Sequence, residues 1–512
     1  MHVRRVAVLG GGPGGLYAAR LLKLAQPSCE VVVHEQGEPD RTFGFGVGLA
    51  AGTQRKLEAA DPDTLRDILA AGHRHDMTMS VRGRGVRVRN DRLIGIARTE
   101  LLAVLRRHAE KVGVRIVYGV RRAADELDAD IVVAADGISS TTRSTGAFGE
   151  DIEVGRGLYL WCGAEFALPD AVFAPVDTEH GVFVTHAYPY SGSRSTFLIE
   201  TDEDTWRRAG FDRSTESTPA DASDVDSLRY LEQVFATHLR GHSLIGNRTR
   251  WTRFRTVRCK RWSSGRVVLL GDAAHTAHFS IGSGTKLAME DAIGLVEALV
   301  GEADAAAAFA RYEARRRPDV ERMQELARRS RLWWESFPSR LHIPVERLMV
   351  AYMTRAGNVP LDRFADTSPD VVAAAAQQYA NSVPPSGGIV DWVLDQPLRH
   401  GRAEFPRRVL PAVPAGLTLT TFADAVADPW DDTGDAVVAR ARRARRNGAD
   451  GFRFAGPADR PAVLTRLDLA ERVRTEAGGL VVVEGPSSSR GDLAAGLVSG
   501  RCDLVSFTEE AA

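Results

Sequence analysis

The sequence predicts an α/β protein in which a parallel sheet of the nucleotide-binding type is interrupted by an antiparallel sheet. Residues 3–35 read as strand, glycine-rich turn, helix and strand, a βαβ unit that implies parallel strands. Segments between 157 and 200 are rich in β-branched and aromatic residues and are broken by glycine, proline and serine, which is typical of antiparallel strands. A buried strand returns at 267–270, so the second sheet is an insertion.

The composition excludes several classes of protein. The chain has 512 residues, 44% of them hydrophobic and 26% charged, so it can bury a large core. Its net charge of −1 gives no electrostatic reason to expect nucleic acid or a membrane as a partner. The four cysteines lie far apart without a CxxC, and no apolar run reaches the ~18 residues that span a bilayer. We therefore expect a soluble, cytoplasmic protein without a signal peptide, a metal site or a disulfide framework.

The other elements follow from local patterns in chain order. Leucine spacing predicts an amphipathic helix over 98–110, and an apolar run predicts a third buried strand at 131–135. The polar segment 214–227 predicts a surface loop. The remaining expectations are antiparallel strands at 157–166, 181–188 and 195–200, helices over 284–300 and 304–336, and a linker at 383–388.

The glycine-rich turn predicts a dinucleotide-binding site. Gly10, Gly12 and Gly15 form GxGxxG between a strand and a helix, where the backbone can approach a pyrophosphate and the helix N-terminus offers N–H groups. Glu35 ends the next strand and is placed to accept hydrogen bonds from an adenosine ribose. An acid at this position fits an unphosphorylated ribose, as in FAD or NAD. A purely structural turn is the less favoured interpretation.

Two further motifs follow buried strands, and together with the first they resemble a known family. Asp136 begins DGISSTTR, and Asp272 lies in GDAAH. In this order and spacing the three motifs resemble the single-component (group A) flavoprotein aromatic hydroxylases of the p-hydroxybenzoate hydroxylase fold, over residues 1 to about 350. The resemblance implies a Rossmann-type FAD-binding domain with an inserted antiparallel substrate domain, and it implies FAD, NADPH or NADH, and O2 as cofactor and co-substrates.

The resemblance also implies roles for individual residues. Asp272 would hold the flavin ribityl hydroxyls, and Arg98 would contact FAD. Gly282 and Gly284 begin a helix whose N-terminus would face the flavin pyrimidine edge and stabilise negative charge there. Asp136 would serve both FAD and NAD(P)H, although an aspartate that caps a strand–helix turn is the alternative.

Longer stretches narrow the resemblance to one subgroup. GDAAHTAHFSIGSGTKLAMEDA (271–292) and the segments 180–190, 195–212 and 247–262 look like the salicylyl-coenzyme A 5-hydroxylase and 2-aminobenzoyl-coenzyme A monooxygenase subgroup. Indole hydroxylases of the violacein pathway share part of this pattern. The implied activity is delivery of one oxygen atom, through a flavin C4a-hydroperoxide, to an electron-rich aromatic ring carried as a coenzyme A or carrier-protein thioester. Hydroxylation of an indole or another free aromatic, and a flavin-binding scaffold without turnover, are the alternatives.

Candidate catalytic and substrate-binding residues come from the inserted sheet and from the segment after GDAAH. His278, His186 and Tyr188 are the candidates for polar contact with the ring, and Trp161 is a candidate pocket wall, against the alternative that these side chains belong to a core. The arginine clusters 315–317, 328–331 and 442–446 are candidates for coenzyme A phosphates, but in a chain this rich in arginine, solvated helix faces are the favoured interpretation.

The expected domains are a FAD-binding domain at 1–156 and 247–350, a substrate-binding sheet at 157–246, a helical linker at 351–395 and a small α/β domain at 396–512. The last segment resembles parts of an old-yellow-enzyme-like FMN barrel. An (α/β)₈ barrel takes ~250 residues, so we expect a shortened remnant without FMN. The expected partner is the aromatic or acyl-thioester substrate, with a carrier protein and a homodimer left open.

Overall fold

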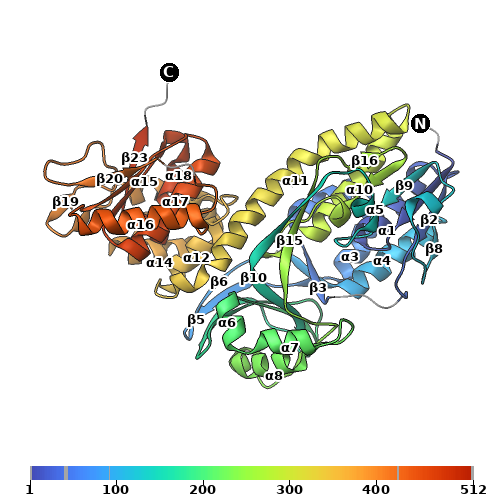
Figure 1. The fold of residues 1–512 in the computed structure, drawn as a ribbon, viewed down its shortest axis with the longest axis horizontal. Coiled ribbons are helices and arrows are strands. Elements are labelled where there is room, and N and C mark those ends of the chain that lie inside the picture. The colour runs from blue at the N-terminus through green and yellow to red at the C-terminus, as the bar shows by residue number, and fades with distance from the viewer. Residues whose placement is uncertain (1–2, 40–43, 91–92, 424–425, 509–512) are drawn as a thin grey trace. The chain divides into compact units, whose positions relative to one another are not determined.

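The computed structural model describes residues 3–39, 44–90, 93–423 and 426–508. The chain forms two compact units (Figure 1). One contains residues 1–78 and 90–331, and the other contains residues 79–89 and 332–512. The expected division into four ranges remains a prediction, but the structure groups residues 332–395 with the C-terminal sheet.

The first unit is built on a six-stranded sheet in the order β16-β17-β9-β1-β2-β8. The pairs β1–β2, β1–β9, β9–β17 and β2–β8 are parallel. Their runs of Val, Ile and Ala are buried, as is typical of a parallel sheet that is covered on both faces. Helix α1 packs beside α4 and α10. The predicted strands and helices are present here, with bounds β1 Arg5–Leu9, α1 Pro13–Ala25, β2 Glu30–His34, α4 Arg98–Lys111, β9 Ile131–Ala134, β17 Val267–Leu269 and α10 Gly284–Gly301. The structure adds β8 Arg115–Val117, α5 Thr141–Thr145 and β16 Ser263–Ser264.

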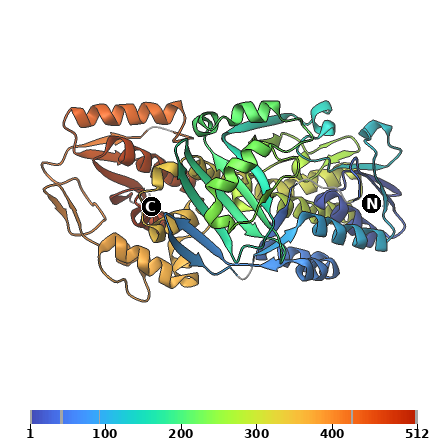
Figure 2. The ribbon, with the colours of Figure 1, turned by 90° about the horizontal axis from the view of Figure 1, so that it is seen from below.

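The antiparallel sheet of this unit has one face buried under short helices. Its strands run in the order β14-β10-β13-β12-β11, and β15 also pairs with β10. Phe183, Phe197 and Phe235 lie in the core between this sheet and the helices, and in Figure 2 the green helices lie in front of the strands. The elements are β10 Glu150–Ala164, β11 Ala171–Thr178, β12 Gly181–Pro189, β13 Ser195–Thr201, α6 Glu203–Arg208, α7 Phe211–Ser217, α8 Val225–Val234, α9 Ala236–Leu239, β14 Leu244–Ile245 and β15 Thr252–Cys259.

The predicted surface loop at 214–227 is confirmed for residues 218–224 and wrong at both ends. Helix α7 runs to Ser217 and α8 begins at Val225. Asp224 is buried, and its carboxylate accepts hydrogen bonds from the backbone N–H and the hydroxyl of Ser227 and from the hydroxyl of Ser214. The polar residues therefore cap a helix and satisfy one another, which composition alone does not distinguish from a solvated loop.

The long helical region after α10 is one continuous helix. Helix α11 spans Ala305–Glu335 and contains Pro318 (Figure 1).

The expected linker at 383–388 lies in the connection between α14, Pro369–Ala380, and α15, Ile389–Leu394. Smaller elements complete the first unit: β3 Gly46–Leu49, α2 Ala51–Ala60, α3 Pro62–Ala71, β4 His73–Arg74 and β7 Ile94–Ala97.

The second unit contains a four-stranded parallel sheet in the order β20-β21-β22-β23, with a helix after each of the first three strands. This is the repeated βα pattern predicted for the C-terminal segment. Helices α12, α14 and α15 pack against α18, so the segment expected as a linker is part of this unit. The elements are α12 Val345–Thr354, α13 Leu361–Thr367, β18 Leu398–His400, β19 Ala403–Phe405, β20 Leu419–Phe422, α16 Asp432–Arg446, β21 Gly451–Phe454, α17 Arg460–Ala477, β22 Leu480–Pro486, α18 Arg490–Ser499 and β23 Leu504–Thr508, and the hairpin β5 Met77–Val81 and β6 Arg84–Val88 lies mostly in this unit.

A buried ion pair ties the start of the second unit to α17. The Arg340 guanidinium donates to both carboxylate oxygens of Glu471, at 2.8 and 2.6 Å, and both side chains are buried. We expect Glu471→Ala to lower the free energy of unfolding by about 3–5 kcal/mol, because it leaves a buried arginine charge unpaired. Denaturant unfolding measures this. The exposed pair Arg399–Glu404 supplies the control Glu404→Ala, and an equal loss in both variants would contradict the prediction.

Candidate active site

Four of the motif residues lie at one edge of the parallel sheet. Gly10 and Glu35 come directly after β1 and β2. Asp136 is the second residue after the end of β9, and Asp272 is the third residue after the end of β17. The strands β17, β9, β1 and β2 are neighbours and parallel, so their carboxyl ends lie side by side. Ligands of open parallel sheets bind at this edge. The structure thus brings together motifs that are up to 262 residues apart in the sequence.

The glycine turn is closed by contacts that leave no room for side chains. A Cβ on Gly10 would lie 2.3 Å from the Ala135 carbonyl oxygen, and the Gly10 φ of 101° is left-handed. A Cβ on Gly15 would lie 2.1 Å from the Gly10 carbonyl oxygen. Gly12 is the N-cap of α1 without a side-chain cap, and its Cβ would face open space. The first N–H groups of α1 are therefore presented to a ligand, as an anion site requires.

The Glu35 carboxylate is held in place by the backbone. Its Oε2 accepts from the Gly11 N–H and its Oε1 accepts from the Gly37 N–H, both at 2.6 Å. A carboxylate has about four lone-pair positions, so both oxygens keep capacity for a ribose hydroxyl. This geometry agrees with the ribose role predicted for Glu35.

Asp272 and Arg98 lie within electrostatic range of each other, although they come from different strand ends. The protein around Asp272 desolvates its carboxylate and raises the pKa of Asp272, while His275 and Arg98 oppose the rise. Asp272 is nevertheless exposed, the combination expected of a group that lines a recess. A Cβ on Gly284 would lie 4.0 Å from Asp272 Oδ1, and Gly282 borders open space. The predicted flavin-binding residues around α10 are thus neighbours.

One carboxylate oxygen of Asp136 stabilises a turn, and the other has no hydrogen-bond partner among the described residues. Its Oδ2 accepts from the backbone N–H and the hydroxyl of Thr142, as an aspartate at a turn would. Its Oδ1 is buried without a hydrogen-bond partner, as is Ser283 Oγ at the start of α10. Unpaired buried polar atoms are costly, so both are candidates for contact with a cofactor.

Arg143 is the last residue of the DG motif, and the sequence analysis assigned it no role. Its guanidinium donates to the Ile138 and Ala273 carbonyl oxygens and to Glu150, at 2.7, 3.1 and 2.8 Å. Arg143 therefore joins the DG motif to the GD motif. Its position seven residues after Asp136 was the available signal.

A buried ionic network fixes the GD turn from behind. Asp291 Oδ2 accepts from the Gly271 N–H at 3.2 Å and lies 2.8 Å from His275 Nε2, while Oδ1 accepts from Arg316 at 2.9 Å. Burial by itself raises the pKa of Asp291, but His275 and Arg316 outweigh burial and leave that pKa below its ordinary value. Asp291 is thus a permanent anion in the core.

The sheet register places the predicted substrate residues on one face. Trp161 and His186 both pair with Leu198, and Tyr188 lies two residues from His186, so all three point away from the helix-covered core. Trp161 Nε1 is buried without a hydrogen-bond partner. Tyr188 donates to the Gly46 carbonyl oxygen at 2.7 Å, and burial raises the pKa of Tyr188 to about 12. Tyr188 is therefore a neutral hydrogen-bond donor rather than a base.

Glu200 is the functional candidate that the sequence analysis missed. It shares this face, with Oε2 2.6 Å from His186 Nε2 and Oε1 3.6 Å from His278 Nε2. The Phe279 ring packs on Tyr159 at 4.8 Å and edge-on to His186 at 6.1 Å. The segment after the GD motif therefore lies against the sheet face. An acid that directly follows the apolar run FLI, in STFLIET, was the signal.

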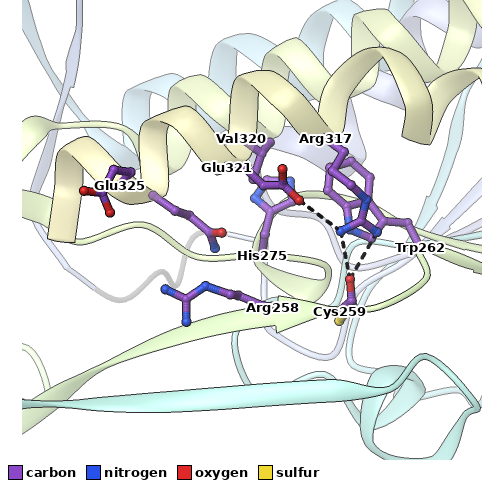
Figure 3. Close-up of a pocket in the computed structure, with 9 residues that line it drawn as sticks. Arg258, Cys259, Trp262, His275, Arg317, Val320, Glu321 and Glu325 are labelled. Atoms are coloured by element: carbon purple, nitrogen blue, oxygen red, sulfur yellow. Dashed lines mark hydrogen bonds and ion pairs between the residues drawn. The ribbon is translucent and has the colours of Figure 1, made fainter. Parts of the chain in front are cut away.

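A cavity of about 310 Å³ lies elsewhere in the first unit, between β15 and α11 (Figure 3). Arg317 crosses it to donate to the Cys259 carbonyl oxygen at 3.1 Å, and its guanidinium lies 5.1 Å from the Trp262 ring. His275 contributes to its wall, but Asp272, His186 and Tyr188 do not. The sheet face, not this cavity, carries the predicted aromatic site.

The arginine clusters serve internal pairing. Arg316 bonds to Asp291, Arg317 to Glu313, Arg328 to Glu325 and Arg442 to Glu476. Their predicted contact with phosphates is not supported by these pairings. Within the described ranges no cluster of His, Cys, Asp and Glu could hold a metal ion, and none of the helices described is long and apolar enough to cross a membrane.

The comparisons with known proteins agree with this geometry. The FAD binding domain family matches residues 96–327. The chain is 46% identical to salicyloyl-CoA 5-hydroxylase of a Streptomyces species, over 65% of this chain and 66% of that enzyme. It is 39% identical to 3-hydroxy-4-methyl-anthranilyl-[aryl-carrier protein] 5-monooxygenase of Streptosporangium sibiricum, over 69% of this chain and 95% of that enzyme. It is 32% identical to protodeoxyviolaceinate monooxygenase of Chromobacterium violaceum, over 70% of this chain and 95% of that enzyme.

Solved structures support the same fold. A variant of 2-methyl-3-hydroxypyridine-5-carboxylic acid oxygenase superposes with a TM-score of 0.53 at 21% identity, covering 73% of this chain and 97% of that one. At this identity the likeness concerns the fold alone.

We expect Gly10→Ala to weaken FAD binding. The added methyl would collide with the Ala135 carbonyl and strain a left-handed residue, which costs about 2 kcal/mol, or roughly thirty-fold in affinity. The FAD-to-protein ratio after gel filtration measures this. Gly52→Ala on exposed α2 is the matched control, and equal FAD content in both variants would refute the prediction.

We expect Asp291→Asn to make the free energy of unfolding depend less on pH between pH 7 and pH 3. Because the folded pKa of Asp291 lies below its unfolded value of about 3.9, its carboxylate stabilises the fold above that pH and loses this effect as pH falls through the folded pKa. The variant should lose about 3–5 kcal/mol at pH 7 and less at pH 3. Denaturant midpoints across this range measure it, and a loss independent of pH would count against Asp291 as the titrating group.

The residues at the carboxyl edge fit FAD: a free helix N-terminus for the pyrophosphate, Glu35 for the ribose, and Asp272 with Arg98 for the remainder. FAD, NAD(P)H and O2, which the sequence predicts, are the cofactor and co-substrates that flavin monooxygenases use. The chain covers 95% of the length of two relatives that are named as monooxygenases. The chain belongs to the family of FAD-dependent monooxygenases.

Proposed function

We propose that the enzyme hydroxylates an electron-rich aromatic ring that is bound as a thioester to coenzyme A or to a carrier protein. The observation that carries this proposal is the aromatic sheet face that meets the segment following the GD motif, through Phe279 against Tyr159 and His186. The names of salicyloyl-CoA 5-hydroxylase and of 3-hydroxy-4-methyl-anthranilyl-[aryl-carrier protein] 5-monooxygenase support the substrate class.

When bound, FAD supplies reduced flavin and activates dioxygen, and the chain's own residues provide the surroundings. Asp272, Arg98 and the N-terminus of α10 would hold the flavin, with Gly282 and Gly284 allowing close approach. Trp161 would form a wall for the ring, and Tyr188 would fix the wall through its bond to Gly46. Burial of this face would exclude water, which protects the reactive oxygen from loss.

His278 acts indirectly in this proposal. Its Nδ1 faces Ser280 Oγ at 2.9 Å and its Nε2 faces Glu200. Both ring nitrogens therefore contact the protein, so we assign His278 a role within this polar cluster rather than in direct contact with the ring.

We place the enzyme in the cytoplasm, because its four cysteines are free and buried. A homodimer, and the origin of residues 396–512 from a shortened FMN barrel, are also proposals.

The similarity to protodeoxyviolaceinate monooxygenase favours a second candidate, a free indole-type aromatic substrate. We expect NAD(P)H oxidation by the FAD-loaded enzyme to rise at least about tenfold with 2-hydroxy- or 2-aminobenzoyl-CoA, with a product that gains one oxygen atom by mass. The free acids and indoles are the controls. Stimulation by these alone would replace the thioester. No stimulation by any of them, or by the same acids loaded on an aryl-carrier protein, would contradict the hydroxylase.

A further inference from the structure

A buried carboxylate lies between two imidazoles on the substrate face of the antiparallel sheet. Glu200 Oε2 is 2.6 Å from His186 Nε2, and Glu200 Oε1 is 3.6 Å from His278 Nε2. The side chains of Glu200, His186 and His278 are 15%, 8% and 5% exposed. The three residues come from β13, β12 and the segment after the GD motif, so only the fold brings them together.

The hydrogen bonds of His278 define which nitrogen carries its proton. Nδ1 accepts from the backbone N–H of Ser280 at 3.4 Å, and it faces Ser280 Oγ at 2.9 Å. A nitrogen that accepts an N–H has no proton of its own, so neutral His278 carries its proton on Nε2, toward Glu200. Ser280 Oγ is 2.7 Å from Ser330 Oγ on α11, which extends the chain of polar contacts.

The surroundings make these imidazoles the partners of Glu200. Tyr159 on β10 pairs directly with Glu200, and burial raises the pKa of Tyr159 to about 12, so it stays neutral. The rings of Phe173 and Phe254 pack against His186 and His278 at 5.3 and 4.9 Å. Within the described ranges no lysine or arginine forms an ion pair with Glu200. Besides Glu200 itself, Arg255 and Asp272 are the charged groups that act on the pKa of Tyr159, and these two are of opposite sign.

We propose that Glu200 is a positioning residue that holds His186 and His278, and that the three groups together take up the proton that hydroxylation releases. This rests on the proposed function. One oxygen atom of dioxygen forms a C–O bond with the ring as the O–O bond breaks, and the second oxygen atom leaves as water. The ring C–H bond then breaks, its electron pair returns to the ring, and the proton passes to the cluster, which releases it to solvent before the next turnover. With neutral imidazoles the cluster changes from a net charge of −1 to zero, which burial favours. Overall, ArH, NAD(P)H, H⁺ and O2 give ArOH, NAD(P)⁺ and water.

The first test compares pH profiles of product formation from 2-hydroxybenzoyl-CoA by the wild type and Glu200→Gln. The amide keeps the size of the side chain but offers only one acceptor oxygen. We expect the variant to be about tenfold slower or worse near pH 7 and to recover by about tenfold per pH unit, as hydroxide or ring ionisation replaces the cluster. FAD content should be unchanged, and Glu203→Gln, an exposed carboxylate three residues away, should behave as wild type. A variant with the wild-type profile would overturn the proposal.

The second test does not require turnover. Imidazole ¹⁵N spectra of the FAD-loaded enzyme, assigned with His186→Gln and His278→Gln, report which ring nitrogen is protonated. We expect Nε2–H in both rings of the wild type, and a change to Nδ1–H in one ring of Glu200→Gln. Unchanged tautomers would refute the positioning role. Changed tautomers in an enzyme that hydroxylates neither thioesters nor free aromatics would instead refute the proposed function and leave the role of Glu200 in place.

Discussion

The parallel pairing of β17, β9, β1 and β2 is the constraint on which the rest of the molecule depends. Val6 pairs with Val31 on one side and Ile131 on the other, and Val133 pairs with Val268. This register aligns four carboxyl ends, so the glycine turn, Glu35, Asp136 and Asp272 share one edge. Arg143 and the buried Asp291 then lock the loops that leave this edge. The residues predicted to bind the flavin are thus brought together by strand order, because each motif alone is only a strand-end turn.

Side chains alternate between the two faces of the inserted sheet, so that one face forms the core and the other carries the candidate site residues. One set of side chains, such as Phe183 and Phe197, packs under α6 to α9 and forms the core. The alternate set carries Trp161, His186 and Glu200. A shift of one residue in the register would exchange the two sets, so the same hydrogen-bond ladder that builds the sheet also specifies the site. The cost of burying Glu200 is offset by two imidazoles, and removing either one would leave a polar group unpaired.

Arginine pairing recurs in both units and shows how this composition is accommodated. Arg316 with Asp291 and Arg340 with Glu471 are buried ion pairs with good geometry, while Arg442 with Glu476 lies nearer to the surface. Buried pairs of this kind stabilise little in themselves, but they are costly to break. In the second unit the parallel strands β20 to β23 form a separate core whose βα repeats do not depend on the flavin-binding sheet.

The sequence alone determined the glycine turn, the acid at position 35, the buried strands and the long helices, because these depend on local spacing and on the apolar period. It also indicated the family, since three motifs in one order are specific. The two ends of the polar segment 214–227 were misjudged, because the capping bonds of Asp224 depend on which hydroxyls fold back onto it. Only the tertiary structure brought Glu200 between His186 and His278, joined Arg143 to the GD motif and placed Asp291 behind it. These contacts join residues that are distant in sequence, and no local pattern encodes a distance across the fold.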